Sequence, residues 1–347
     1  MAGERKSVIS VDAMGSDSGP STIVKGINKA LRKHRKVKIL LHGPEDQLRP
    51  LVDNYTLTQK NIEICDAPDV IQMGDKPAAA LRKRKGTSMF STLEAVRDKR
   101  ATTAVSCGNT GALMAISTIT LKRMEGVKRP AIAVFWPSLN PQQYNVVLDV
   151  GADIKADADD LWVHAHLGSA YASNAFKLDR PRVGLLNVGT EDHKGTGPVK
   201  EASELFGAHK DTLSFEYIGF VEGDGISSDS VDVVVTDGFA GNIALKTAEG
   251  TAKVIGEILR GAFKYSLLSR FASVFAITSL WRLKRRIDPR YANGGVFLGL
   301  NGTVVKSHGG ADSTGIAAAL DLAIRLDQNG FSQKVAGQLS EPRQKQR

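Results

Sequence analysis

The sequence predicts an α/β protein with a mainly parallel sheet. Short apolar runs alternate along the chain with segments of helical spacing, which is typical of βαβ units. Two of these runs, residues 131–135 and 146–150, show no polar alternation, as expected of parallel strands covered on both faces. Four runs end in glycine-bearing polar turns that lead into helical segments. In open α/β sheets such turns gather at the carboxyl edge of the strands, where ligands bind.

The predicted elements follow one another in a regular order. Strand candidates lie at residues 8–12, 37–41, 62–65, 105–106, 131–135, 146–150, 183–188, 215–220, 231–236, 296–300 and 303–306. The pair Asn301-Gly302 favours a hairpin between the last two. Helix candidates lie at residues 21–33, 77–84, 88–97, 112–124 and 157–177. In the first of them Ile23, Ile27 and Leu31 share one face.

The length of 347 residues exceeds a typical domain of roughly 100–200 residues. We expect one large α/β unit over residues 1–331, either as a single body or as two lobes. Residues 332–347 are polar and are expected to form a flexible tail. Hydrophobic residues make up 42% of the chain and charged residues 24%, which is ordinary for a soluble globular protein.

The net charge of +9 favours acidic partners. Basic residues cluster at 32–36, 82–85 and 282–286, and solvated helix faces are the alternative reading of the first cluster. Aromatic residues make up only 6% of the chain, with no stacking platform or zinc-finger pattern, so nucleic acid is not the expected partner. An acidic protein or an anionic membrane surface fits better.

The two cysteines, Cys65 and Cys107, imply no disulfide framework and no metal pair. Residues 1–10 begin polar and charged and then enter a strand-like run, so no signal peptide is expected. A cytoplasmic location follows as an expectation.

The four glycine-bearing turns are the candidate binding features. They occupy residues 108–111, 189–195, 237–242 and 307–312. Free N–H groups at a helix start, with glycines that permit close approach, form an anion site. Together the turns predict a cleft built around phosphate or another anion.

One charge-free segment, residues 271–281, lies between Arg270 and Arg282. It is shorter than the roughly 20 apolar residues that a spanning helix needs. Its aromatic residues and flanking cations favour a helix lying in a membrane interface, with a buried dimer or core helix as the alternative. The residues expected to contact the membrane, in an amphipathic insertion near residues 260–288, are Leu267, Leu268, Phe271, Phe275, Leu280 and Trp281.

Several kinds of chemistry are disfavoured by the motifs. The dinucleotide, P-loop, nucleophile-elbow and zinc-protease motifs are absent from the sequence. The acidic residues at 153–160 fit the capping of a helix that begins near Asp157 better than a magnesium site. Cys107 is a candidate nucleophile, but packing against a crowded turn is its favoured role. His164 and His166 are expected to be ordinary helix residues.

Four longer stretches carry a resemblance to a known family. They are Val11-Asp12-Ala13-Met14-Gly15-Ser16-Asp17, Gly108-Asn109-Thr110-Gly111-Ala112-Leu113-Met114-Ala115, Asp237-Gly238-Phe239-Ala240-Gly241-Asn242-Ile243-Ala244-Leu245-Lys246-Thr247 and Val305-Lys306-Ser307-His308-Gly309. With these stretches the chain resembles the phosphate acyltransferase family of bacterial phospholipid synthesis, from residue 8 to about residue 325. Cys107 departs from the usual alanine, which argues against a required thiol, and Gly310 replaces serine or alanine.

The resemblance implies a fold and a reaction. The fold is a three-layer α/β/α sandwich, similar to the phosphotransacetylase and isocitrate-dehydrogenase class. In the reaction, inorganic phosphate attacks the thioester of a long-chain acyl group on acyl carrier protein, giving acyl phosphate and free carrier. The product would feed glycerol-3-phosphate acylation by a membrane acyltransferase. No cofactor or metal is implied. The alternatives are a soluble short-chain phosphotransacetylase that uses coenzyme A and a non-catalytic membrane-associated scaffold.

Such a reaction needs a phosphate cradle and charge stabilisation more than covalent catalysis. We expect the phosphate-binding residues to be Gly108, Asn109, Thr110, Gly111 and Asn242. Lys306 and His308 are expected to stabilise charge, and Asp237 to orient a group or act as a base. The expected dock for acyl carrier protein is Arg82, Lys83, Arg84 and Lys85. The family further implies a homodimer that associates peripherally with the inner face of the cell membrane.

Overall fold

The computed structural model describes residues 7–265, 275, 278, 294–331 and 334–335. Its strands are β1 (Val8–Asp12), β2 (Lys38–Gly43), β3 (Ile62–Asp66), β4 (Thr103–Ser106), β5 (Ala131–Pro137), β6 (Tyr144–Leu148), β7 (Arg182–Leu186), β8 (Glu216–Val221), β9 (Val233–Val235), β10 (Gly295–Leu298) and β11 (Thr303–Lys306). Its helices are α1 (Pro20–Lys33), α2 (Glu45–Asp53), α3 (Thr56–Asn61), α4 (Pro77–Arg82), α5 (Ser88–Arg97), α6 (Thr110–Leu121), α7 (Ala158–Phe176), α8 (Gly197–Ala208), η1 (Gly223–Ser227), α9 (Gly238–Lys264) and α11 (Ser313–Gln328). The α/β class predicted from the sequence is confirmed.

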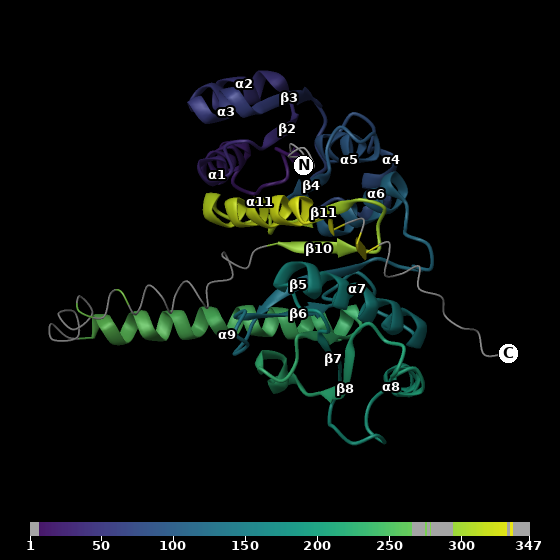
Figure 1. The fold of residues 1–347 in the computed structure, drawn as a ribbon. Coiled ribbons are helices and arrows are strands. Elements are labelled where there is room, and N and C mark those ends of the chain that lie inside the picture. The colour runs from purple at the N-terminus through teal and green to yellow at the C-terminus, as the bar shows by residue number, and fades with distance from the viewer. Residues whose placement is uncertain (1–6, 266–274, 276–277, 279–293, 332–333, 336–347) are drawn as a thin grey trace, which may run out of the picture.

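The strands form one sheet in the order β3-β2-β1-β4-β11-β10-β5-β6-β9-β7-β8. Seven of its neighbouring pairs are parallel. The pairs β11·β10, β10·β5 and β5·β6 are antiparallel. Because of these three reversals, β6, β9, β7 and β8 run opposite to β1 to β4 and β11. Strands β10 and β5 lie between the two groups. The sheet therefore consists of two parallel halves of opposite direction, which Figure 1 shows one above the other.

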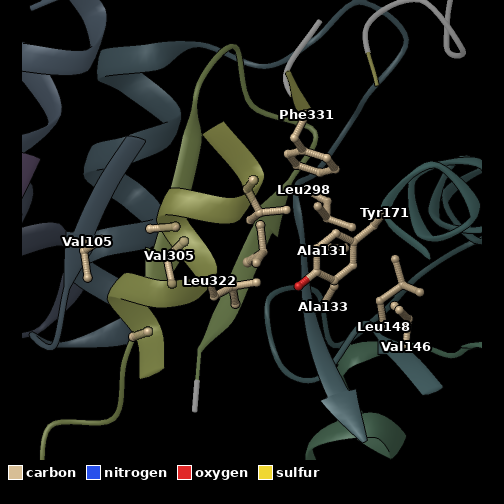
Figure 2. Packing of buried hydrophobic residues seen from close by; sticks show 14 of the residues in the cluster. Val105, Ala131, Ala133, Val146, Leu148, Tyr171, Leu298, Val305, Leu322 and Phe331 are labelled. Carbon is tan, nitrogen blue, oxygen red and sulfur yellow. The ribbon is translucent and has the colours of Figure 1, made fainter. Parts of the chain in front are cut away.

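Helices cover both faces of the sheet. On β6, Val146 and Leu148 belong to one core cluster and Val147 to the other. The first cluster lies under α1, α11, α7 and α8, and it runs without interruption from Val105 in one half to Val146 in the other (Figure 2). The second lies under α5 and α6. The result is the three-layer α/β/α sandwich.

The direction of β5 differs from the expectation, whereas β6 pairs in parallel with β9 as well as antiparallel with β5. Their apolar runs predicted parallel strands, but β5 is antiparallel to both of its neighbours. The physical reason is that an unbroken apolar run reports burial of both faces, whichever way the strand runs. The hairpin predicted at Asn301-Gly302 is confirmed by the antiparallel pairing of β10 with β11.

Helix α9 extends well beyond the rest of the protein (Figure 1). Gly238 and Gly241 are its only buried residues among those described. Apolar side chains along it are exposed, including Val254 at 58% and Ile258 at 65%. Such a helix carries an apolar surface that the described part of the chain leaves uncovered. Among the helices of the described residues, none combines the length and the apolar character that crossing a bilayer requires.

Candidate functional site

The four glycine-bearing turns fall into two pairs. The turns after β4 and β11 share one edge of the sheet, because these strands are parallel neighbours with Lys306 beside Ser106. The turns after β7 and β9 share another edge for the same reason, and we call it the β7/β9 edge. The three reversals between β11 and β6 direct these two carboxyl edges oppositely. The expectation that all four turns gather at one edge is therefore wrong, because strand direction depends on pairings that local sequence does not reveal.

At the β4/β11 edge three loops touch, since the turn after β1 joins the other two. A Cβ on Gly15 would lie 2.4 Å from the backbone nitrogen of Gly108, so only glycine allows this approach. The N–H of Asp17 donates to the carbonyl of Gly309 at 3.0 Å. These contacts place the turns after β1, β4 and β11 in one polar cluster, which we call the β4/β11 site.

Lys306 is the charged centre of the β4/β11 site. Its ammonium donates to the carbonyls of Cys107 at 2.8 Å and Ser307 at 2.6 Å. Burial lowers the pKa of Lys306 to about 8, although Cys107, Asp12 and Asp17 act in the opposite direction. A lysine ammonium has three hydrogens. Two carbonyl acceptors leave one hydrogen for an anionic ligand.

The start of α6 supplies backbone donors to the same site. Thr110 and Gly111 are the first residues of α6, and the first N–H groups of a helix have no acceptor within it. Both residues are exposed, whereas Gly108 is buried. The site therefore joins an open helix N-terminus to a partly buried lysine, a combination suited to an anion.

The Asn109 side chain is committed to structure. Its Oδ1 accepts from the N–H of Ala112 at 2.9 Å and caps α6. Its Nδ2 donates to the carbonyls of Met73 at 2.7 Å and Asp75 at 3.0 Å. Both amide hydrogens thus have protein acceptors, and Asn109 shapes the turn rather than offering a free donor.

His308 and Cys107 take different places in the site. His308 is exposed, and its Nδ1 accepts from the N–H of Gly310 at 3.1 Å. Cys107 is 2% exposed, and burial raises its pKa to about 11. A buried thiol with a raised pKa is a poor nucleophile, which agrees with the packing role predicted for Cys107.

Sequence reasoning missed one residue of the β4/β11 site, the buried carboxylate of Asp12. Asp12 ends β1 and is 1% exposed. Its Oδ1 accepts from Ser88 Oγ at 2.7 Å and its Oδ2 from Ser106 Oγ at 2.7 Å. Burial raises the pKa of Asp12, against the effect of these two hydrogen bonds. The available signal was a carboxylate that ends an apolar strand just before a glycine turn.

The turns at the other edge hold the remaining predicted residues. Asp237 caps α9, because its Oδ1 accepts from the N–H of Ala240 at 2.7 Å. Asn242 is exposed and donates to the carbonyl of Val150 at 3.1 Å. Lys194 in the β7 turn is 41% exposed and pairs with Glu191 at 2.8 Å. No contact among the described residues brings these side chains to the β4/β11 site.

In the loop after β6, at this second edge, a buried carboxylate organises the backbone. Asp149 is fully buried and its carboxylate accepts from the N–H groups of Ile132, Gly151, Ala152 and Asp153, at 2.6–3.0 Å. Asp157 forms a capping box with Asp160 at the start of α7. The capping predicted for Asp157 is confirmed.

The predicted carrier dock lies at the end of α4. Arg82, Lys83 and Lys85 are exposed. Arg84 instead donates to the carbonyl of Leu81 at 2.7 Å and lies 5.6 Å from the ring of Phe90. At the start of α4, Pro77 packs closely against Gly111. A Cβ added to Gly111 would lie 2.8 Å from the ring of Pro77. The dock therefore begins one short helix away from the start of α6.

The predicted membrane segment lies almost wholly outside the described residues. Leu267, Leu268, Phe271, Leu280 and Trp281 belong to the part that the structure does not describe. Phe275 is described and is 86% exposed. The predicted tail, residues 332–347, also lies outside, apart from residues 334–335.

Comparisons with known proteins extend over nearly the whole chain. A family model described as "Fatty acid synthesis protein" matches residues 7–334. A phosphate acyltransferase from Ruegeria pomeroyi is 57% identical over 333 residues, which are 96% of this chain and 90% of the relative. One from Paracoccus denitrificans is 56% identical over 334 residues, with the same coverage of both chains.

Solved structures of more distant proteins share the fold. A phosphotransacetylase from Streptococcus pyogenes superposes with a TM-score of 0.60 at 15% identity, covering 95% of this chain and 94% of its own. The EutD phosphotransacetylase from Staphylococcus aureus gives a TM-score of 0.57 at 16% identity, covering 95% of both chains. At this identity the likeness concerns the fold, and it confirms the class expected from the sequence.

Proposed function

The chain belongs to the phosphate acyltransferase family and is an acyltransferase, and we propose that it transfers a long-chain acyl group from acyl carrier protein to inorganic phosphate at the β4/β11 site. The observation that carries this placement is Lys306, a partly buried cation whose ammonium donates to the carbonyl of Cys107, in the turn that leads into α6 at Thr110. Such a lysine is costly to bury unless an anion completes it.

The proposed reaction needs positioning and charge stabilisation. A phosphate oxygen attacks the thioester carbon, the C–O bond forms and the C–S bond breaks. The proton of the hydrogen phosphate dianion ends on the carrier thiol, so the products are acyl phosphate and free thiol. Phosphate is held by the first N–H groups of α6, at Thr110 and Gly111, and by the third hydrogen of the Lys306 ammonium. His308, exposed at the same turn, adds a donor for the developing oxyanion.

We propose different roles for the other predicted site residues, each supported by the contacts that the residue makes. Gly108 gives the close approach of the β1 and β4 turns, and Asn109 caps the helix. For Asp237, predicted to orient a group or act as a base, we propose the orienting role, because it caps α9. Asn242 stays a candidate phosphate ligand at the other edge, and variants at both edges decide between the two.

We also propose that the exposed cations at the end of α4 receive acyl carrier protein. Helix α4 packs against α6, and α6 begins at the β4/β11 site. A carrier held at Arg82, Lys83 and Lys85 would present its acyl thioester to that site. Complementary charge of this kind mainly accelerates encounter.

The exposed apolar face of α9 supports two further proposals. A second copy of the chain covers part of it in a homodimer. The residues that follow α9, with Phe275 exposed, lie on an anionic membrane from the cytoplasmic side. There the acyl phosphate passes to a membrane glycerol-3-phosphate acyltransferase without crossing water.

One assay tests the reaction and its rivals together. Palmitoyl carrier protein is mixed with the enzyme, with and without phosphate, and released thiol is measured. We expect release that requires phosphate and persists in chelator. Preference for acetyl-coenzyme A would indicate a short-chain phosphotransacetylase, and absence of phosphate-dependent release would indicate a scaffold. Either result contradicts the proposal.

A further inference from the structure

Asp12 lies where three separate parts of the chain meet. Besides Ser88 and Ser106, its carboxylate accepts from the N–H of Met14 at 3.1 Å. Ser88 begins α5, Ser106 ends β4 and Met14 lies in the turn after β1. One buried carboxylate thus ties the first turn of a helix to two of the loops that form the β4/β11 site.

Ser106 connects this carboxylate to the backbone of the site. Its hydroxyl donates to Asp12 Oδ2 at 2.7 Å and accepts from the N–H of Gly108 at 3.1 Å. Because the donor direction of the hydroxyl is fixed by Asp12, its oxygen lone pairs are fixed toward Gly108. The turn that leads into α6 is therefore oriented through Ser106.

The same carboxylate acts on Lys306. Lys306 lies beside Ser106 in the sheet, and its ammonium donates to the carbonyl of Cys107 at 2.8 Å. Cys107, Asp12 and Asp17 each raise the pKa of Lys306, against the effect of burial. Asp17 is exposed and Cys107 is buried, with a raised pKa. Asp12 is thus the buried carboxylate of this set, where charge is least screened by water.

We propose that Asp12 is a positioning residue for the acyl transfer. It orients the Gly108 turn through Ser106, and it keeps the Lys306 ammonium charged for phosphate. At 1% exposure it does not itself reach a substrate. This inference rests on the proposed function, because it assumes that phosphate is bound at the β4/β11 site.

Two serine variants separate positioning from simple support of the fold. Ser88→Ala and Ser106→Ala each remove one hydroxyl that donates to Asp12 at 2.7 Å. Of the two, Ser106 also holds the N–H of Gly108. With thermal unfolding measured for both, we expect Ser106→Ala to lose about tenfold in kcat, and Ser88→Ala about threefold at most. Equal losses in the two variants would overturn the positioning role.

The pH profile tests the effect on Lys306. In the unaltered enzyme, activity needs a charged Lys306, so it is retained below a pH of about 8 and falls above it. Removing the negative charge in Asp12→Asn lowers the pKa of Lys306 further, and we expect the basic limb to move to lower pH. A limb that stays in place in folded Asp12→Asn overturns the electrostatic role. If Asp12→Asn does not fold, the two serine variants decide.

Failure of the underlying site is recognised separately. Lys306→Met removes the cation without altering Asp12, Ser88 or Ser106. Wild-type turnover in folded Lys306→Met would overturn the placement of phosphate at this edge. A different set of results would overturn only the inference about Asp12. In that set Lys306→Met loses turnover, Ser88→Ala and Ser106→Ala lose kcat equally, and the basic limb of the pH profile stays in place in Asp12→Asn.

Discussion

The two carboxyl edges of the sheet use buried carboxylates in opposite ways. At the β7/β9 edge, the carboxylate of Asp149 accepts from four backbone N–H groups, so both of its oxygens have partners within the fold. At the β4/β11 edge, Asp12 takes two hydroxyls and one N–H, and a lysine that retains an unused hydrogen lies close by. The comparison teaches that a buried charge with all its partners maintains architecture, whereas Lys306, whose ammonium keeps one hydrogen without a protein acceptor, is available for chemistry.

The largest expected effect comes from removing the cation at the β4/β11 edge. Lys306→Met should reduce kcat by roughly 10²–10³, the usual loss when one preorganised donor to a developing charge is removed. Thiol release from palmitoyl carrier protein measures it, and circular dichroism verifies the fold.

The other edge offers the matched control for Lys306→Met. Lys194→Met removes a lysine that also follows a strand and a glycine turn, but this lysine is exposed and paired with Glu191. We expect its loss in kcat to be far smaller, because an exposed ion pair contributes little. A larger loss in Lys194→Met or in Asn242→Ala than in Lys306→Met would move the phosphate site to the β7/β9 edge.

The second prediction concerns the free energy of unfolding and Asp149, which lies in the loop after β6 at the β7/β9 edge. Asp149→Asn replaces an acceptor oxygen with an NH₂ group that faces backbone donors, and an unsatisfied buried group costs about 1–3 kcal/mol. Chemical denaturation should show this loss, while the folded variant keeps its turnover. Asp229→Asn, on an exposed residue, is the control and should change little. If Asp149→Asn abolished turnover with stability intact, the contrast between the edges would not hold.

Local patterns in the sequence were enough for most of the strands and for the layers. The apolar residues of β1 and β11 are buried and the predicted strands are there, because burial on a sheet leaves a local pattern. The direction of β5 was not predictable, since an apolar run is the same read either way along a sheet. The three antiparallel pairings from β11 through β10 and β5 to β6 together decide which glycine turns share an edge.

The site was predicted less completely than the fold. Lys306 and the turn from Gly108 to Gly111 could be proposed as site residues because strand, glycine and helix start are consecutive in sequence. Asp12 was missed because its partners, Ser88 and Ser106, are 76 and 94 residues away along the chain. The cap formed by Asp237 and the one formed by Asn109 are local, but a cap and a ligand-binding polar side chain have the same sequence signature.

A smaller effect is expected where the carrier protein docks beside the β4/β11 edge. Lys83→Glu together with Lys85→Glu should raise the KM for acyl carrier protein several-fold and leave the KM for phosphate nearly unchanged, because the charge reversal slows encounter. Added salt should reduce the difference. Arg35→Glu, in the basic cluster at residues 32–36, is the comparison. A larger effect of Arg35→Glu would place the dock at that cluster.

The smallest effect is expected at Cys107, the one thiol within the β4/β11 site. Cys107 is 2% exposed, and burial raises its pKa to about 11, so at neutral pH it is a thiol and not a nucleophilic thiolate. Its backbone carbonyl, which accepts from Lys306, survives replacement of the side chain. Cys107→Ala should therefore keep turnover within about threefold of wild type, and lose at most about 1 kcal/mol of unfolding free energy from the small cavity.

Serine at the same position separates volume from chemistry, because it restores most of the size without a competent thiol. An inactive but stably folded Cys107→Ala, with Cys107→Ser equally inactive, would contradict the packing role. Acyl group trapped on this sulfur during turnover would then show that the β4/β11 edge acts by covalent catalysis rather than by charge alone.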